Sequence, residues 1–173
     1  MAIYSFKNYI PKIPSTCFLA PGAQVIGNIA LGNNVSIWHN SVLRGDVNQI
    51  VIGDNTNIQD LSMLHITESS PLLIGENVTV GHSVTLHGCN IGNNSLIGMG
   101  ATVLDNSIIG DFSIVAAGSL VPPNKTYPPK SMIMGNPAKA VRELKDKEIE
   151  MLNKHYIYYV GYAKDFKLKV EEI

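Results

Sequence analysis

One aliphatic residue recurs every six positions along most of this 173-residue chain. The residue four places after it is mostly small or β-branched, and Gly, Asn and Asp fill the segments between. A period of six leaves room for one short strand and one corner, so it predicts a triangular coil of parallel strands about 4.8 Å apart. The register is occupied by Ile13, Leu19, Val25, Leu31, Ile37, Leu43, Ile52, Ile58, Leu64, Ile74, Val80, Leu86, Ile91, Ile97, Val103, Ile109, Val115 and Val121.

Three such hexads close one turn, so the pattern predicts an all-β, single-stranded parallel β-helix of about six turns with the aliphatic residues in its core. Alternation with turn breaks also suits an antiparallel sandwich, but a sandwich would not hold a strict six-residue phase. Apolar spacings of three and four predict a C-terminal α-helix from about Asp146 to Phe166.

Two proline pairs, Pro122-Pro123 and Pro128-Pro129, are expected to end the strand ladder, because proline cannot donate to it. The resulting division of the chain has four parts: an N-terminal segment 1–12, the β-helix 13–125, a connecting segment 126–145, and a C-terminal helix and tail 146–173.

The net charge is −1, from 13 basic and 14 acidic residues, and no basic stripe points to nucleic acid. No stretch approaches the roughly 18 apolar residues of a membrane span, and the first residues lack the apolar core of a signal peptide. We therefore expect a cytoplasmic protein. Cys17 and Cys89 form no Cys-x-x-Cys pair and are expected to be small buried residues.

The hexad phase breaks three times, after Leu43, Leu64 and Leu86, and candidate site residues lie at these breaks. Arg44, His65 and His87 each directly follow one of these leucines, so we expect them in one outward-facing column on consecutive turns. The two imidazoles would then lie one strand spacing apart, about 5 Å, which suits a shared metal ion.

His82 falls on another face, near a corner and directly above Asp60, and does not obviously converge with His65 and His87 within one chain. A symmetric trimer would bring it against the pair of a neighbouring chain. Asp60 would meet Arg44 across the same interface. His39 and His155 are expected to be structural.

Three neutral imidazoles leave one tetrahedral position of Zn²⁺ open, which is typical of catalytic rather than structural zinc. The metal lowers the pKa of bound water to about 7 and so provides hydroxide at neutral pH. Attack on a small electrophile such as CO₂ is the natural chemistry of such a site.

Five short motifs carry a family resemblance: Leu43-Arg44-Gly45-Asp46, Asn57-Ile58-Gln59-Asp60, Leu64-His65, Val80-Gly81-His82 and Leu86-His87-Gly88-Cys89. With them the chain resembles the γ-class carbonic anhydrases, and most closely their short bacterial homologues. The resemblance implies a left-handed coil, which the repeat alone does not fix because parallel crossovers are usually right-handed. It also implies a homotrimer with three sites between subunits.

The same resemblance implies roles for particular residues. His65, His82 and His87 would hold zinc, or alternatively iron (Fe²⁺) or cobalt (Co²⁺). Gln59, helped by Asn57, would orient the hydroxide or the CO₂/bicarbonate substrate. An interface network would contain Arg44, Asp46 and Asp60, and among the helix tyrosines Tyr159 is the candidate to reach the site.

One departure from the family concerns proton export. The archetypal γ enzyme carries acidic loops, whereas the loop from Thr67 to Pro71 holds Glu68 as its only acid, so turnover is expected to be slow. Three alternatives stay open: an acyl-CoA-dependent acyltransferase, suggested by Gly135-Asn136-Pro137-Ala138-Lys139, a catalytically weak metal-binding trimer, and a thioesterase.

Overall fold

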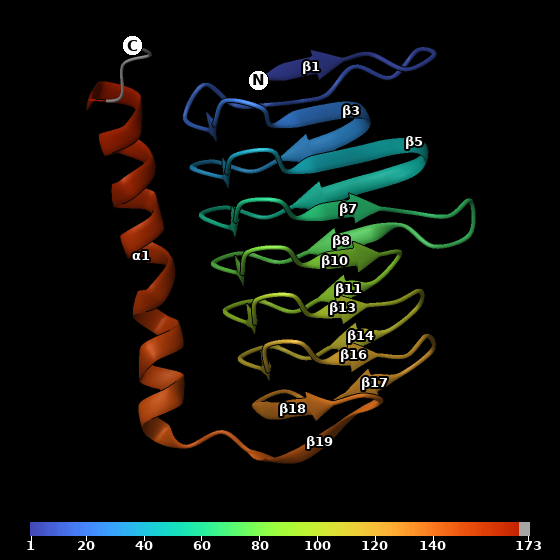
Figure 1. Cartoon of the computed structure of the whole chain (residues 1–173), viewed down its shortest axis with the longest axis vertical. Helices are drawn as coiled ribbons and strands as arrows, with labels where there is room; N and C mark the ends of the chain where they lie inside the picture. Colours follow the sequence, from blue (N-terminus) through green and yellow to red (C-terminus); the bar gives the residue numbers. More distant parts are fainter. Residues whose placement is uncertain (170–173) are drawn as a thin grey trace.

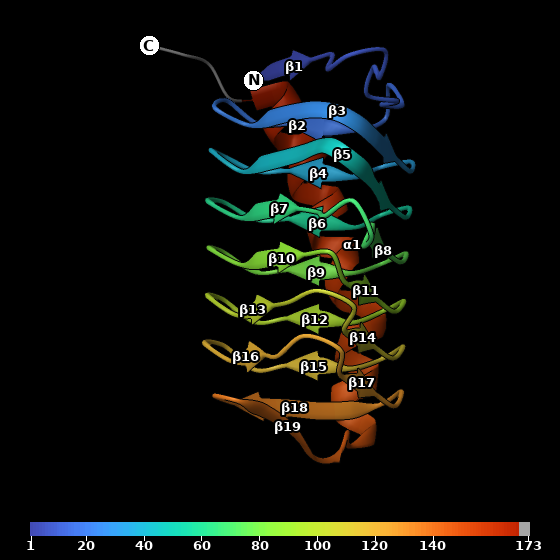
Figure 2. The same cartoon turned by 90° about the vertical axis from the view of Figure 1, so that its right-hand side faces the viewer.

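Short parallel strands stack as the rungs of a prism, with one long helix running beside them (Figure 1). The structure is a computed structural model that describes residues 1–169, so the last four residues of the expected tail lie outside it. The prism has three faces, A, B and C, and seen from the side its turns lie one above another (Figure 2).

The strands group by face. Face A holds β3 (Gln24–Leu31), β5 (Val42–Ile52), β7 (Met63–His65), β10 (Thr85–His87), β13 (Thr102–Val103) and β16 (Leu120–Val121), with β1 (Ala2–Tyr4) paired to β3. Face B holds the ends of β3 and β5, then β8 (Leu72–Ile74), β11 (Asn90–Ile91), β14 (Ile108–Ile109) and β17 (Thr126–Tyr127). Face C holds β2 (Phe18–Leu19), β4 (Ser36–Ile37), β6 (Asn57–Ile58), β9 (Thr79–Val80), β12 (Leu96–Ile97), β15 (Ile114–Val115), β18 (Ser131–Gly135) and the antiparallel β19 (Ala138–Glu143).

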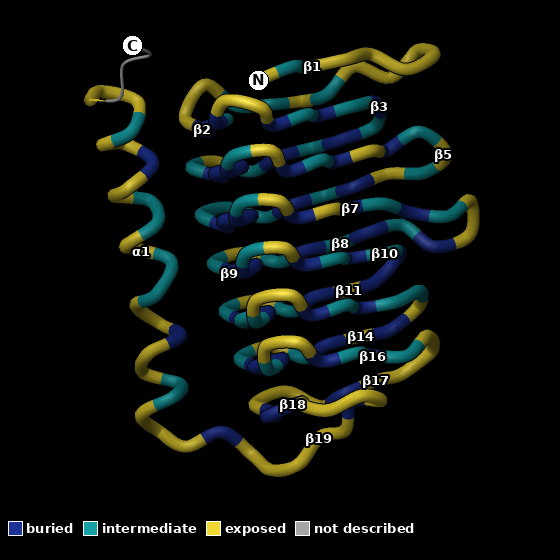
Figure 3. The backbone as a smooth tube through the Cα atoms, in the orientation of Figure 1, coloured by how far each residue is buried: buried dark blue, intermediate teal, exposed yellow. Residues whose placement is uncertain are grey.

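The hexad residues form the core, as predicted. All of them except Ile13 and Leu19 are buried, and buried segments of the chain, in dark blue, recur from turn to turn along the stack (Figure 3). Leu43, Leu64 and Leu86 are paired in register on face A and fully buried. The chain is a left-handed parallel β-helix, and the fold class expected from the repeat and the resemblance is confirmed.

The expected end of the coil was wrong. Within residues 1–169, face C has seven parallel strands, one for each turn, instead of about six. β17 pairs with β14 and β18 with β15, so the ladder continues through 126–135. Pro123 and Pro129 occupy corner turns between strands, where the fixed φ of proline is tolerated and no ladder hydrogen bond is needed.

A column of asparagines lines the corner between faces B and C. Asn34, Asn55, Asn77 and Asn94 all have φ between 54° and 58°, a region that asparagine tolerates better than most residues. Their side chains hydrogen-bond from turn to turn at 3.0–3.2 Å. The asparagines expected at the corners therefore also link successive turns through side-chain hydrogen bonds.

Helix α1 (Asp146–Lys169) covers face C over most of its height and extends three residues past its expected end (Figures 1 and 2). Leu152 and Ala163 are its buried residues, and Phe166 lies edge-on to Trp38 with ring centroids 5.1 Å apart. No helix of the described residues has the length and apolarity needed to cross a membrane.

Both cysteines are packed in the core, Cys17 at 7% and Cys89 at 1% exposure. Burial raises the pKa of each thiol, which disfavours the reactive thiolate. We therefore expect neither thiol to react with a disulfide reagent in the native protein at pH 8, and both to react once the protein unfolds. Rapid labelling of native Cys89 would contradict this packing.

Candidate metal centre

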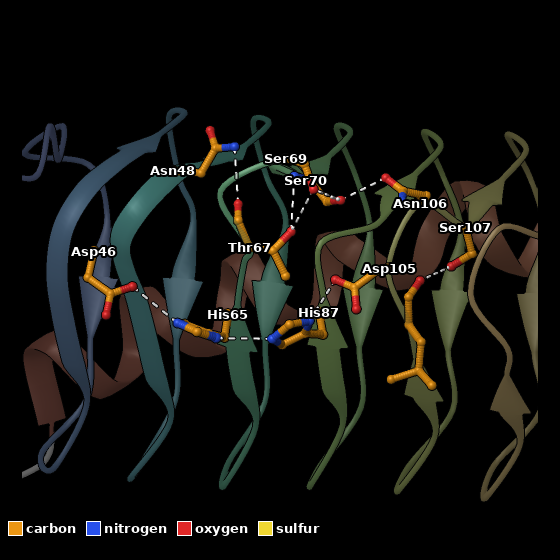
Figure 4. Close-up of polar contacts among 11 residues, drawn as sticks. Asp46, Asn48, His65, Thr67, Ser69, Ser70, His87, Asp105, Asn106 and Ser107 are labelled. Atoms are coloured by element: carbon orange, nitrogen blue, oxygen red, sulfur yellow. Dashed lines mark hydrogen bonds and ion pairs between the residues drawn. The ribbon is translucent and has the colours of Figure 1, made fainter.

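His65 and His87 lie side by side at the ends of β7 and β10 on face A (Figure 4). Their backbones are paired in register, with ring centroids 5.1 Å apart. His65 Nδ1 faces His87 Nε2 at 3.0 Å. The hexad register thus places two imidazoles within reach of one small ion.

Each imidazole of this pair turns its other ring nitrogen to a carboxylate. His65 Nε2 lies 3.1 Å from Asp46 Oδ1, and His87 Nδ1 lies 2.7 Å from Asp105 Oδ1. Arg44 donates to the second oxygen of Asp46. Because an ionised carboxylate only accepts, the outer ring nitrogens carry hydrogens, and the two nitrogens that face each other are the ones that remain for a metal.

His82 stands apart, at the corner between faces C and A. It belongs to a column with His39 and Asp60, in which His82 Nδ1 lies 2.9 Å from Asp60 Oδ2 and His39 Nδ1 lies 3.2 Å from Asp60 Oδ1. In the part of the chain that the structure describes, no three His, Cys, Asp or Glu residues gather as a metal-holding group. Within residues 1–169 of one chain, His82 is therefore not part of the His65–His87 pair.

Two of these carboxylates, Asp46 and Asp60, have a lowered pKa and stay charged at neutral pH. Burial acts to raise the pKa of Asp46, but hydrogen bonds from His65 and Arg44 hold it below its ordinary value. Burial also acts to raise the pKa of Asp60, but hydrogen bonds from its own backbone, His39 and His82 outweigh this effect and lower the pKa. Arg44 binds Asp46 within the chain, so the expected pairing of Arg44 with Asp60 stays a prediction about the interface.

Gln59 and Asn57 are buried on face C at 3% and 0% exposure, at the head of a hydrogen-bond chain. Gln59 Nε2 donates to Asn57 Oδ1 at 3.1 Å, and Asn57 Nδ2 donates to Thr79 Oγ1 at 2.9 Å. Thr79 Oγ1 lies 3.0 Å from Nδ1 of His155 on α1. Burial lowers the pKa of His155, which favours the neutral ring and lets Nδ1 accept from the threonine hydroxyl.

Tyr159 lies on the same side of α1, and a cavity of about 290 Å³ between the helix and face C is lined by Gln59, His155 and Tyr159 together with apolar residues of β12 and β15. Burial, reinforced by Tyr162 and Asp60, raises the pKa of the Tyr159 hydroxyl, so it remains protonated at neutral pH. The structure thus brings Tyr159 to the Gln59 side of the corner rather than to the His65–His87 pair.

Two polar residues of this region were missed by sequence reasoning. Asp105 lies two places after Val103, which is in register with Leu86, so counting along the repeat places it beside Gly88, the residue after His87. His155 was expected to be structural. Its spacing from Leu152 and Tyr159 places it on the inner face of the helix, but nothing in the sequence identifies Thr79 as its hydrogen-bond partner.

The loop expected to lack a proton shuttle is short and well anchored. Asn48 Nδ2 donates to the backbone oxygens of Thr67 and Glu68 at 3.2 and 2.9 Å. Ser70 is buried, whereas Glu68 is exposed. A family model described as bacterial transferase hexapeptide (six repeats) matches residues 88–123.

Relatives of known name extend the match to most of the chain. A carbonic anhydrase of Geobacillus kaustophilus is 44% identical over 94% of this chain and 91% of its own length. The chain belongs to the γ-carbonic anhydrase family. The mitochondrial gamma carbonic anhydrase 2 of Arabidopsis thaliana is 43% identical over 88% of the chain, and the chain spans 57% of that relative's length. The crystal structure of a hexapeptide transferase family protein from Anaplasma phagocytophilum superposes with a TM-score of 0.92 at 38% identity, covering 95% of this chain and 97% of that one.

The family implies a metal cofactor, and the residues present fit one. Two Zn–N bonds of 2.0–2.1 Å at a tetrahedral angle put their nitrogens about 3.3 Å apart. The observed 3.0 Å between His65 Nδ1 and His87 Nε2 needs only a small ring movement. His82 also has one ring nitrogen on a carboxylate and keeps its Nε2 for a ligand bond, with its side chain 44% exposed at the corner.

Proposed function

We propose that the chain is a metal-dependent carbonic anhydrase that hydrates CO₂ reversibly at sites between the subunits of a homotrimer. The observation that supports it best is the His65–His87 pair, whose facing nitrogens are 3.0 Å apart and whose outer nitrogens rest on carboxylates. His82 of a neighbouring subunit completes the set. Zinc is the proposed metal, with Fe²⁺ or Co²⁺ as alternatives.

The protein's own groups then have distinct tasks. A divalent metal supplies a water of pKa near 7. Asp46 orients His65, and Asp60 orients His82 while it also contacts His39. Gln59 is held by Asn57, so its amide is fixed where it would orient a small substrate, and the protonated Tyr159 hydroxyl is a donor on the same wall.

Apolar groups around the His82 corner support a trimer. Three large apolar residues flank this corner and are exposed: Leu61 at 62%, Met63 at 42% and Met99 at 60%. Large apolar side chains gathered near an incomplete site suit an interface that desolvates them. In such a trimer His82 and the pair of the next chain would converge.

We expect the purified protein to carry one metal per chain and to catalyse CO₂ hydration that a chelator abolishes and the re-added metal restores. Stopped-flow hydration with a pH indicator, together with elemental analysis, measures both. With Glu68 as the only acid of its loop, kcat should rise with buffer concentration, because external buffer replaces a missing proton acceptor. Metal without hydration at any pH would leave a metal-binding trimer, and no metal at all would refute the proposal.

An acyltransferase is the second candidate, favoured by one feature of the structure. A cavity of about 460 Å³ at the end of the coil is lined by Lys125 and Lys139 and by the Pro137–Ala138 part of the β18–β19 hairpin. Binding of acetyl-CoA without metal, measured by calorimetry, would favour the acyltransferase. Hydrolysis of the acetyl-CoA thioester by the metal-loaded protein would favour a thioesterase instead.

A further inference from the structure

Asp105 is attached to the candidate centre through a single short contact. Its Oδ1 lies 2.7 Å from His87 Nδ1, on the far side of the ring from His65 (Figure 4). Among the described residues it is the third carboxylate that meets one of the three histidines, after Asp46 and Asp60. It sits one turn further along the prism than His87, in the corner segment after β13.

The backbone around Asp105 is fixed by neighbouring turns. The Asn124 N–H donates to the Asp105 carbonyl at 2.8 Å, and the Asn106 N–H donates to the Gly88 carbonyl at 2.8 Å. Ser70 Oγ, from the loop after β7, donates to Asn106 Oδ1 at 2.7 Å (Figure 4). Three neighbouring turns therefore fix the backbone from which the Asp105 side chain reaches His87.

Gly88 makes room for the carboxylate. Its φ is +51°, and a Cβ at this position would lie 2.4 Å from Asp105 Oδ1 and 2.8 Å from Ser70 Cβ. A side chain there would therefore displace Asp105 and collide with the loop. Gly88, which directly follows His87, therefore leaves the space that Asp105 needs to reach the ring.

We propose that Asp105 is a positioning residue that sets the orientation and tautomer of His87 for metal binding, an inference that rests on the function proposed above. Asp105 accepts the Nδ1 hydrogen of His87, which leaves the Nε2 lone pair directed at His65 Nδ1. A carboxylate behind a ligating imidazole fixes its ring and raises its basicity. Without it the ring is free to rotate and to move its hydrogen to Nε2, where no metal can bind.

Asp111 offers a matched comparison. It occupies the next corner of the same turn, and its Oδ1 accepts the backbone N–H of Asn93 at 2.7 Å without touching a histidine. Asp105→Asn and Asp111→Asn therefore change the same group in similar corners. Only the first should affect the metal.

The test is the zinc affinity of the metal-free protein, measured by competition with a chromophoric chelator. For Asp105→Asn we expect a 10- to 100-fold loss of affinity, the usual range for such partners, and no change for Asp111→Asn. The ¹⁵N chemical shifts of the His87 ring should show Nδ1–H in the wild type and a mixture of tautomers in Asp105→Asn.

Equal zinc affinity of Asp105→Asn and wild type would overturn the inference while leaving the proposed function intact. Equal losses in the two variants would also overturn it, because damage to the coil would then be the cause. A wild type that binds no zinc, iron or cobalt would instead refute the proposed function, so the two failures are distinguishable.

Discussion

Mixed trimers of His65→Ala and His82→Ala chains should recover about a quarter of wild-type CO₂ hydration, because about three quarters of randomly mixed three-fold trimers contain both chains and each of these has one intact site out of three. His65 belongs to the pair on face A, whereas His82 contacts Asp60 at the corner between faces C and A. Each variant alone should lose more than about 100-fold in kcat/KM, which exceeds the usual effect of changing a residue that only contacts a metal ligand.

The experiment uses unfolding and refolding of equal amounts of the two variants, followed by hydration assays and metal analysis. His39→Ala is the matched control, because His39 contacts the same carboxylate of Asp60 as His82 does. It should keep its metal and its activity. Full metal retention by His82→Ala, or no recovery in mixed trimers that are proven to form, would exclude a site shared between chains.

Ile109→Ala should lower the free energy of unfolding by about 2–5 kcal/mol, the usual cost of truncating a buried aliphatic side chain to alanine. Ile109 is 1% exposed in the core of face B and lies in register with Ile91 and Tyr127. The interior is narrow, so the turns above and below have little freedom to fill the cavity.

Ile108→Ala is the comparison within the same strand, since Ile108 points outward and is 44% exposed. Its loss should cost about 1 kcal/mol or less. Urea unfolding followed by circular dichroism at equal protein concentrations gives both values, and the fixed concentration matters because an oligomer's stability depends on it. Equal losses for the two variants would mean that β14 does not alternate between core and surface as the structure has it.

Much of the fold was predictable because a six-residue repeat fixes both the strand and the inward residue. The pairing of Leu64 with Leu86, and therefore of His65 with His87, follows from counting along the register. The hand of the coil did not follow from the repeat and required the family resemblance. The end of the coil was misjudged because Pro128-Pro129 was assigned to a ladder position, whereas β17 and β18 continue on either side of it.

The site was only partly accessible to sequence reasoning. Columns of residues can be counted, so Asp60 was correctly placed beneath His82, and their side chains meet. The direction in which a ring turns cannot be counted, so the contact of His87 with Asp105 one turn further on was not foreseen. The link from His155 to Thr79 spans 76 positions and depends on how α1 docks on face C, which no local pattern encodes.

The candidate metal pair comes from two successive turns, and each turn of the stack contacts chiefly the turns on either side of it. Adding or deleting a whole turn near either end of the prism would lengthen or shorten the molecule and leave the imidazole spacing unaltered. In this architecture the number of turns can therefore change without changing the metal-binding residues. A designer could extend the coil, for instance to display a tethered cargo, without rebuilding the centre.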